Sequence, residues 1–307
     1  MARPSSVPFA RVALDRGRAI ELWNEDAVRG LARRIPAGGA DVVVTSPPYN
    51  VGAPYGRYAD DRPRAEYIDW LRAVSAAVDR VLSDAGSFFL NVGGRPSDPW
   101  LPWDVARAVA ERFRLQNVIH WVKSIAIDRA SAGRDSGVRR DLALGHYKPL
   151  LSARYLHGAH EYIFQFTRRG DVPIDRLAIG VPFADKSNVE RWRASRGDLR
   201  CRGNTWFLPY PTIRERARDR PHPATFPVEL PAWCLQLHGI GRVRRAVDPF
   251  VGIGASAVAA ARLGVGFVGF DVDRDYLQEA LRRVRAERTA RRDSAPGTAR
   301  ASAPRRT

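Results

Sequence analysis

Cysteine and lysine are scarce in this chain of 307 residues. Cys201 and Cys234 are the only cysteines, and neither stands in a spacing typical of metal ligands. We therefore expect neither a disulfide framework nor a zinc site, and no metal of any kind. Two thiols without a chemical role are the favoured interpretation.

Long apolar runs are also missing. No stretch of about 18 apolar residues occurs, so no membrane span is expected. The first residues lack the apolar core of a signal peptide, and we expect a cytoplasmic protein associated with the nucleoid. The composition, with 45% hydrophobic residues and eight tryptophans, is typical of a globular chain.

Positive charge is abundant and comes almost entirely from arginine. The net charge is +17, whereas the only lysines are Lys123, Lys148 and Lys186. A strongly basic chain is typical of proteins with a nucleic-acid partner. The planar arginine fork suits phosphates and guanine edges. A basic surface without a partner is the alternative, and most single arginines are expected simply to face solvent.

Strand and helix patterns alternate along most of the chain. Strands are predicted at residues 19–23, 41–44, 87–92, 117–122, 161–166, 244–248 and 265–270. Helices are predicted at residues 26–34, 65–82, 103–113, 255–263 and 274–288. Such alternation indicates an α/β fold, with a mostly parallel sheet and helices on both of its faces.

A stiff corner, Thr-Ser-Pro-Pro-Tyr-Asn at residues 45–50, follows one of the predicted strands. Proline fixes its own φ and restricts the residue before it. Ser46, Pro47, Pro48 and Tyr49 can therefore hold carbonyls and a ring in one place. The corner is suited to catching something flat at the carboxyl end of a strand, where open α/β sheets bind ligands.

A glycine turn, Asp-Pro-Phe-Val-Gly-Ile-Gly at residues 248–254, joins a predicted strand to a helix. Its glycines permit a tight turn and close approach of a ligand. Asp271 ends the next strand, nineteen positions after Gly252, where a carboxylate can bind ribose hydroxyls. Ala257 occupies the place of the third glycine of a dinucleotide site, which favours a nucleoside ligand without phosphates. An ordinary strand-to-helix turn is the alternative.

The two motifs together resemble the S-adenosylmethionine-dependent DNA amino-methyltransferases, which methylate the exocyclic amine of adenine or cytosine. The corner precedes the glycine turn, as in the beta subgroup, which has a circularly permuted Rossmann-like sheet. The resemblance covers most of residues 19–288. It implies S-adenosylmethionine as cofactor and double-stranded DNA as partner. It also implies a restriction–modification or epigenetic role, with a cognate restriction endonuclease as a candidate partner.

The resemblance assigns cofactor-binding roles position by position, to Asp26, Asp248, Phe250, Gly252, Gly254, Asp271, His222 and Phe226. Asp271 matches the acid that binds ribose, and Asp26 the acid that meets the adenine. His222 and Phe226 belong to a His-Pro-x-x-x-Pro segment beside the methionine end. Relatives often carry threonine where this chain has Ala255-Ser256, and we expect Ser256 to supply the hydroxyl.

Methylation of an exocyclic amine explains why a rigid Ser-Pro-Pro-Tyr corner is useful. The amine lone pair is delocalised into the base, and two acceptors aimed at its N–H bonds would make it available. The Ser46 hydroxyl and the Pro47 carbonyl can be these acceptors, already held in position. The target base must be flipped out of the duplex, and Tyr49 offers a face for stacking. No covalent enzyme intermediate is required.

The resemblance only weakly chooses the base. Members with serine first in the corner often act on cytosine-N4, and those with aspartate on adenine, so Ser46 favours cytosine-N4. Adenine-N6 methylation is the alternative. An RNA substrate and a catalytically silent nucleic-acid-binding module are less favoured, because both motifs are intact.

Four regions are expected along the chain. They are a catalytic half at 1–123, a target-recognition region at 124–221 that also holds a sheet strand near 161–167, a cofactor-binding half at 222–290, and a disordered basic tail at 291–307. Arginine, amide, lysine and aromatic side chains suit base edges and phosphates. The candidate DNA contacts are Asn50, Lys123, Arg139, Arg140, Arg200, Arg202, Asn204 and Trp206.

Overall fold

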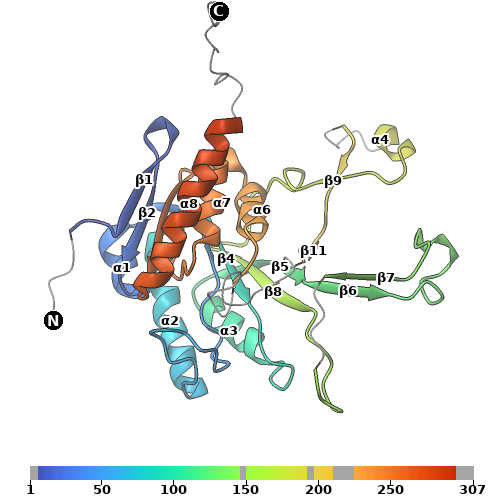
Figure 1. Ribbon diagram of the computed structural model, residues 1–307, viewed down its shortest axis with the longest axis horizontal. Coiled ribbons are helices and arrows are strands. Elements are labelled where there is room, and N and C mark those ends of the chain that lie inside the picture. The colour runs from blue at the N-terminus through green and yellow to red at the C-terminus, as the bar shows by residue number, and fades with distance from the viewer. Residues whose placement is uncertain (1–5, 146–149, 192–196, 210–224, 295–307) are drawn as a thin grey trace, which may run out of the picture.

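One large mixed sheet organises the molecule (Figure 1). The computed structural model describes residues 6–145, 150–191, 197–209 and 225–294. Within them the nine strands of this sheet lie in the order β1-β2-β13-β12-β3-β4-β8-β5-β11. The strands are β1 (Ala10–Ala13), β2 (Ala19–Asn24), β3 (Ala40–Thr45), β4 (Leu82–Val92), β5 (Arg114–Val122), β8 (His160–Thr167), β11 (Thr205–Phe207), β12 (Arg245–Asp248) and β13 (Gly266–Asp271).

The strand directions match a predominantly parallel sheet with two exceptions. Neighbours from β2 through β13, β12 and β3 to β4 are parallel, and β11 is parallel to β5. β8 runs antiparallel to β4 and β5, and β1 runs antiparallel to β2. The predicted α/β fold is confirmed, as are the predicted strands that pair in its centre.

Helices cover both faces of the sheet because the strand side chains alternate between them. On β3, Val42 and Val44 pack into one core with the helices α6, α7 and α8. Val43 points into the other core, with α1, α2 and α3. The helices are α1 (Ala27–Arg34), α2 (Arg64–Val81), α3 (Leu101–Ala110), α6 (Glu229–His238), α7 (Ala255–Leu263) and α8 (Arg274–Ser294).

The helix beside the glycine turn, α7, is built for close packing. It is rich in alanine, and its residues from Ala255 to Ala261 are buried. Gly254 before it and Gly264 after it adopt left-handed φ values of 83° and 67°, which glycine allows without strain. The turn and the helix thus pack closely against the sheet, and larger side chains at these buried positions would not fit.

The chain between β5 and α6 departs furthest from the sequence-based expectation. The hairpin of β6 (Ser124–Ile127) and β7 (Leu142–Gly145) extends away from the sheet in Figure 1. β9 (Val181–Pro182) pairs with β10 (Leu199–Arg200), and the short helix α4 spans Ser187–Arg191. β11, however, joins the main sheet beside β5, so the region predicted for target recognition contributes a second strand to the sheet.

The two ends of the described chain add smaller corrections. The strand β1 was not predicted, and α8 continues to Ser294, into the first residues of the predicted basic tail. The rest of that tail lies outside the described residues. Over the portion of the chain that the structure describes, no helix is long and apolar enough to cross a membrane.

Candidate active site

The proline corner and the glycine turn meet at the carboxyl ends of two adjacent parallel strands. β3 ends at Thr45 and β12 ends at Asp248. The Thr45 hydroxyl donates to Asp248 Oδ1 at 2.5 Å, and the Ser256 hydroxyl donates to Asp248 Oδ2 at 2.5 Å. The backbone N–H of Phe250 also donates to Asp248 Oδ1, at 2.9 Å. Asp248 therefore fastens the two motifs to each other.

The Asp248 carboxylate is buried, and burial disfavours its ionised form. Burial raises the pKa of Asp248 to about 6, although its three hydrogen bonds act in the opposite direction. Neither Asp248 nor Ser256 borders the cavity beside the turn. Their mutual hydrogen bond holds the turn in shape, and their predicted contacts with the cofactor stay predictions.

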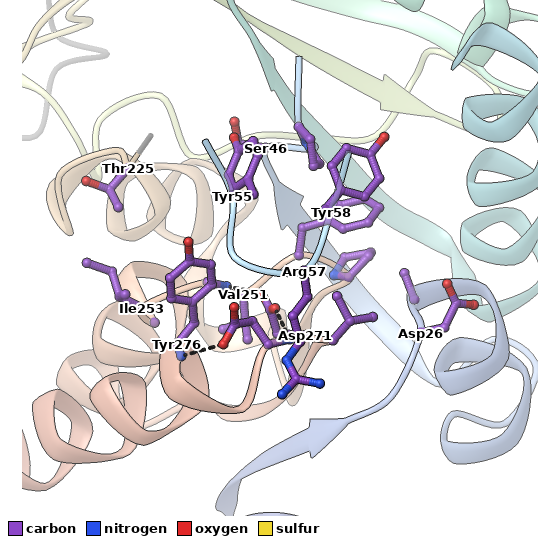
Figure 2. A pocket seen from close by; sticks show the side chains of 18 of the residues that line it. Asp26, Ser46, Tyr55, Arg57, Tyr58, Thr225, Val251, Ile253, Asp271 and Tyr276 are labelled. Atoms are coloured by element: carbon purple, nitrogen blue, oxygen red, sulfur yellow. Dashed lines mark hydrogen bonds between the residues drawn. The ribbon is translucent and has the colours of Figure 1, made fainter. Parts of the chain in front are cut away.

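A cavity of about 300 Å³ lies between the corner and the glycine turn (Figure 2). That volume is at the lower end of the range for small-molecule sites. Eight of the residues singled out in the sequence line it: Asp26, Ser46, Pro48, Phe226, Phe250, Gly252, Gly254 and Asp271. His222 lies outside the described residues.

Asp271 closes the glycine turn through backbone hydrogen bonds, and its predicted contact with ribose stays a prediction. The Gly252 N–H donates to Asp271 Oδ2 at 2.9 Å, and the Asp273 N–H donates to Oδ1 at 2.8 Å. Burial is the main cause that raises the pKa of Asp271 to about 6. At Gly254, an added Cβ would come within 2.7 Å of the Ala280 Cβ, so a side chain cannot fit there without movement.

Asp26, which was predicted to meet the cofactor adenine, lies at the start of a helix. Asp26 caps α1, where its carboxylate accepts the Arg29 N–H at 3.1 Å. Figure 2 shows Asp26 and Asp271 approaching the cavity from different elements, β2–α1 and β13 respectively. Two carboxylates at separate ends of one cavity can bind two different hydrogen-bonding parts of a ligand.

A loop with no predicted site residues beyond Asn50 also borders this cavity. Tyr55, Arg57, Tyr58 and Arg62 line it, together with Trp70 of α2. The Tyr58 hydroxyl is buried and has no hydrogen-bond partner among the described residues. Burial raises the pKa of Tyr58 to about 12, so its hydroxyl stays a donor at neutral pH. The closely spaced tyrosines just after the corner were the available signal.

The shape of this loop depends on Asp60 and Asn50. The buried Asp60 carboxylate accepts the backbone N–H groups of Asn50, Val51 and Ala53 at 2.7–3.1 Å. Asn50 has a left-handed φ of 58°, and both ends of its side-chain amide bond the Arg62 backbone at 2.7 Å. Asn50 thus orients the loop; its predicted contact with DNA stays a prediction.

Behind the corner lies a polar network that reaches β4, β8 and the residue that follows β5. The Ser46 hydroxyl is 2.7 Å from the Tyr49 hydroxyl, which donates to Glu161 Oε2 at 2.9 Å. Asn91 Nδ2 donates to the Tyr49 hydroxyl at 2.5 Å and to Glu161 Oε2 at 2.8 Å. Lys123 Nζ pairs with Glu161 Oε1 at 3.0 Å. Asn91 and Glu161 were not among the predicted site residues.

The two proline carbonyls of the corner differ. The Tyr67 hydroxyl donates to the Pro48 carbonyl at 2.7 Å, which fixes the corner against α2. No donor among the described residues contacts the Pro47 carbonyl. Pro47 itself is buried, and Tyr49 is partly buried and does not line the cavity. The corner therefore contributes Ser46 and Pro48 to the cavity wall, whereas Pro47 and Tyr49 do not line it.

The candidate DNA contacts fall into distinct groups. Trp206 is fully buried on β11, where its indole N–H donates to the Gly203 carbonyl at 3.1 Å, so its prediction as a contact is wrong. Trp206 was mistaken for a surface aromatic because its strand is short and surrounded by polar residues. Arg139, Arg140 and Arg200 are exposed.

The remaining candidates have partners within the protein. Arg202 bonds the Ile179 carbonyl at 2.9 Å and lies over the Trp233 ring. Asn204 Nδ2 donates to the Val118 carbonyl at 2.9 Å. Lys123 is engaged by Glu161. Within the described ranges, no three His, Cys, Asp or Glu side chains gather as a metal site.

Comparisons with known proteins address the whole arrangement. A family model described as DNA methylase, of the N6/N4 type, matches residues 40–282. The type II methyltransferase M.ScaI of Streptomyces caespitosus is 26% identical over 87% of this chain and 81% of its own length. The DNA adenine methyltransferase YhdJ of Escherichia coli strain K12 is 24% identical over 82% and 78%.

A solved structure shares the fold. The cytosine-N4-specific PvuII DNA methyltransferase superposes with a TM-score of 0.61 at 16% identity, covering 92% of this chain and 90% of its own. The family match includes both the corner at 45–50 and the turn at 248–254.

Proposed function

The chain belongs to the N6/N4 DNA methylase family, and from this membership we propose that it transfers a methyl group from S-adenosylmethionine to the N4 amine of cytosine in double-stranded DNA. The observation that carries the proposal is the junction at Asp248, which joins the Ser-Pro-Pro-Tyr corner to the cofactor turn through Thr45 and Ser256. A methyl donor in the cavity would lie directly beside Ser46.

The residues around the cavity suit S-adenosylmethionine. Asp271 can accept hydrogen bonds from ribose hydroxyls, and Asp26 can meet the adenine. Phe250 and Trp70, whose ring centroids are 5.3 Å apart, provide an apolar wall. When bound, S-adenosylmethionine would supply an electrophilic methyl group on a sulfonium that leaves as a neutral thioether, and the methylated amine would then lose one proton to water.

The corner would activate the amine without forming a covalent bond to the base. Ser46 Oγ and the Pro47 carbonyl oxygen each can accept one N–H of the amine, which directs its lone pair toward the methyl group. The prolines and the Tyr67 bond to the Pro48 carbonyl keep these acceptors in place before the base arrives. Preorganised acceptors of this kind lose no energy to reorganisation during the reaction.

Serine at the first position of the corner favours cytosine-N4 over adenine-N6. The alternative has support of its own, because YhdJ, which is similar to this chain, is named a DNA adenine methyltransferase. Both bases present an exocyclic amine, and the corner chemistry is the same for both. The base choice therefore rests on Ser46 alone.

The substrate in this proposal is a duplex from which the target base is extruded. The net charge of +17 and the exposed arginines of the projecting hairpin suit a polyanion. Relatives such as M.ScaI are named type II methyltransferases, so we include a cognate restriction endonuclease among the proposed partners.

The modified nucleoside tests the proposal. Unmethylated genomic duplex DNA is incubated with the protein and S-adenosylmethionine, digested to nucleosides and analysed by mass spectrometry. We expect N4-methyldeoxycytidine. N6-methyldeoxyadenosine would reject the base choice, and transfer to RNA alone would reject the DNA substrate.

A further inference from the structure

Glu161 lies at the far end of the hydrogen-bond chain that starts at Ser46. It comes from the start of β8, a strand that runs against its neighbours, and lies 112 positions after Tyr49. Its side chain is 12% exposed, and its two oxygens have different partners. Oε1 accepts from Lys123 at 3.0 Å, and Oε2 accepts from Tyr49 at 2.9 Å and Asn91 at 2.8 Å.

The carboxylate determines which hydroxyl donates in the Ser46–Tyr49 bond. An ionised carboxylate has no proton, so it can only accept hydrogen bonds. The single hydroxyl proton of Tyr49 is therefore used toward Glu161. The 2.7 Å bond between Tyr49 and Ser46 then requires Ser46 to be the donor. With its one proton directed away from the cavity, Ser46 Oγ has its lone pairs to offer.

The contacts of Asn91 support the same direction of hydrogen bonding, from Ser46 to Tyr49 to Glu161. Its Nδ2 group has two protons, and the two shortest contacts, to Tyr49 and Glu161, use them. The contact to Ser46 Oγ is longer, at 3.4 Å. Reversing the amide would place its oxygen against the Glu161 carboxylate. The buried Asn91 Oδ1 has no hydrogen-bond partner among the described residues, so the amide is held this way although one of its atoms is unsatisfied.

We infer that Glu161 is a positioning residue for methyl transfer: through Tyr49 it turns the Ser46 hydroxyl into an acceptor for the amine of the target base. Lys123 keeps the carboxylate beside the hydroxyl chain, and Asn91 aligns it. The inference rests on the proposed function, because it concerns how that function's corner is oriented. It gives Tyr49 a task that its hydroxyl performs, in addition to any stacking by its ring.

Replacement of Glu161 by glutamine tests this direction with little change in shape. A glutamine amide can donate to Tyr49, which lets Tyr49 donate to Ser46 and Ser46 donate into the cavity. We expect E161Q to lower the single-turnover rate of methyl transfer about 10- to 100-fold. The Kd values for S-adenosylmethionine and DNA and the melting temperature should change little. E287Q is the matched control, since Glu287 is an ion-paired, partly buried glutamate on α8.

A double-mutant cycle shows whether Glu161 acts through Tyr49. Y49F keeps the ring and removes the hydroxyl, so adding E161Q to Y49F should cost less than about twofold in rate. An equal loss from E161Q in both backgrounds would overturn the inference. So would a parallel fall in rate, cofactor affinity and melting temperature, which is the signature of a merely structural role.

Two further outcomes keep the test decisive. K123M leaves the carboxylate in place and removes its cation, so it should lower the rate by less than E161Q; it provides the measurement if E161Q does not fold. A K123M rate equal to wild type in that case would overturn the inference. Wild-type protein that methylates no DNA would remove the proposed function and the inference together, whereas an active wild type with an equally active E161Q removes the inference alone.

Discussion

The cofactor side and the target side of this site are built in different ways. On the cofactor side, Asp248 and Asp271 end adjacent parallel strands and bond backbone groups within a few residues. On the target side, Ser46 is connected through Tyr49 to Glu161 of the antiparallel strand β8 and to Lys123, the residue that follows β5. The two carboxylates on the cofactor side each bond backbone groups close to them in the chain, although Asp248 also bonds the distant Thr45. The orientation of the Ser46 hydroxyl depends, through Tyr49, on the distant Glu161.

This difference separates two kinds of substitution. Changes on the cofactor side should weaken the binding of S-adenosylmethionine and leave the rate at saturation nearly intact. Changes on the target side should lower the rate and leave cofactor binding nearly intact. Any variant that alters both to the same extent contradicts the division.

Substitution of Ser46, the proposed acceptor for the amine, should have the largest effect. S46A removes one of the two proposed acceptors for the amine and should lower kcat about 100- to 1,000-fold, the range seen when one preorganised hydrogen-bonding group is lost. Single-turnover methylation and calorimetric titration of the cofactor measure the two quantities separately. S83A is the control and should match wild type, because Ser83 lies at the start of β4 and the network residue Asn91 lies near its end.

Loss of the ribose acid should have the next largest effect, on the other side of the comparison. D271A removes a carboxylate expected to accept two ribose hydroxyls and should weaken S-adenosylmethionine binding about 10- to 100-fold. The rate at saturating cofactor should stay within a few fold of wild type. A large fall in that rate with an unchanged Kd would mean that Asp271 belongs to the catalytic side.

Acidic pH should weaken cofactor binding through the same residue. Burial raises the pKa of Asp271 to about 6, and ribose hydroxyls favour its ionised form, so protonation below pH 6 opposes binding. Between pH 7 and pH 5 the Kd should rise about tenfold, as expected for a group with this pKa. D271N cannot titrate, and its Kd should vary much less over this interval.

Removal of two exposed arginines should have the smallest effect. It should change neither the affinity for S-adenosylmethionine nor the rate at saturating substrates. Arg139 and Arg140 lie in the projecting hairpin. R139A/R140A should reduce the slope of log K against log salt for duplex DNA by up to about 2. R282A/R285A removes the same charge from α8 and serves as the control. An unchanged slope in the first variant would exclude the hairpin from DNA binding.

The position of a motif in the fold could be predicted where its residues are consecutive in the chain. The corner at 45–50 and the turn at 248–254 each carry their residues in one short run, and the parallel strand order brings the two together. The spacing to Asp271 was informative because one helix and one strand always separate such a pair. These features depend on local geometry and on general rules for α/β sheets.

Prediction failed where tertiary structure decides. Trp206 stands among arginines and polar residues, yet β11 inserts it into the core. Glu161 was read only as part of a strand, because nothing in the sequence pairs it with Tyr49 or Lys123. The loop containing Tyr55 and Tyr58 covers the cavity because buried Asp60 holds it there, and no periodic pattern encodes that arrangement.

The central claim is that the proline corner presents acceptors to an extruded base beside the methyl donor. The most direct measurement is a crystal structure with a duplex substrate and an unreactive analogue of S-adenosylmethionine. It should show the exocyclic nitrogen of the flipped base within about 3.2 Å of both Ser46 Oγ and the Pro47 carbonyl oxygen. A flipped base seated elsewhere, with neither atom in contact, would contradict the account.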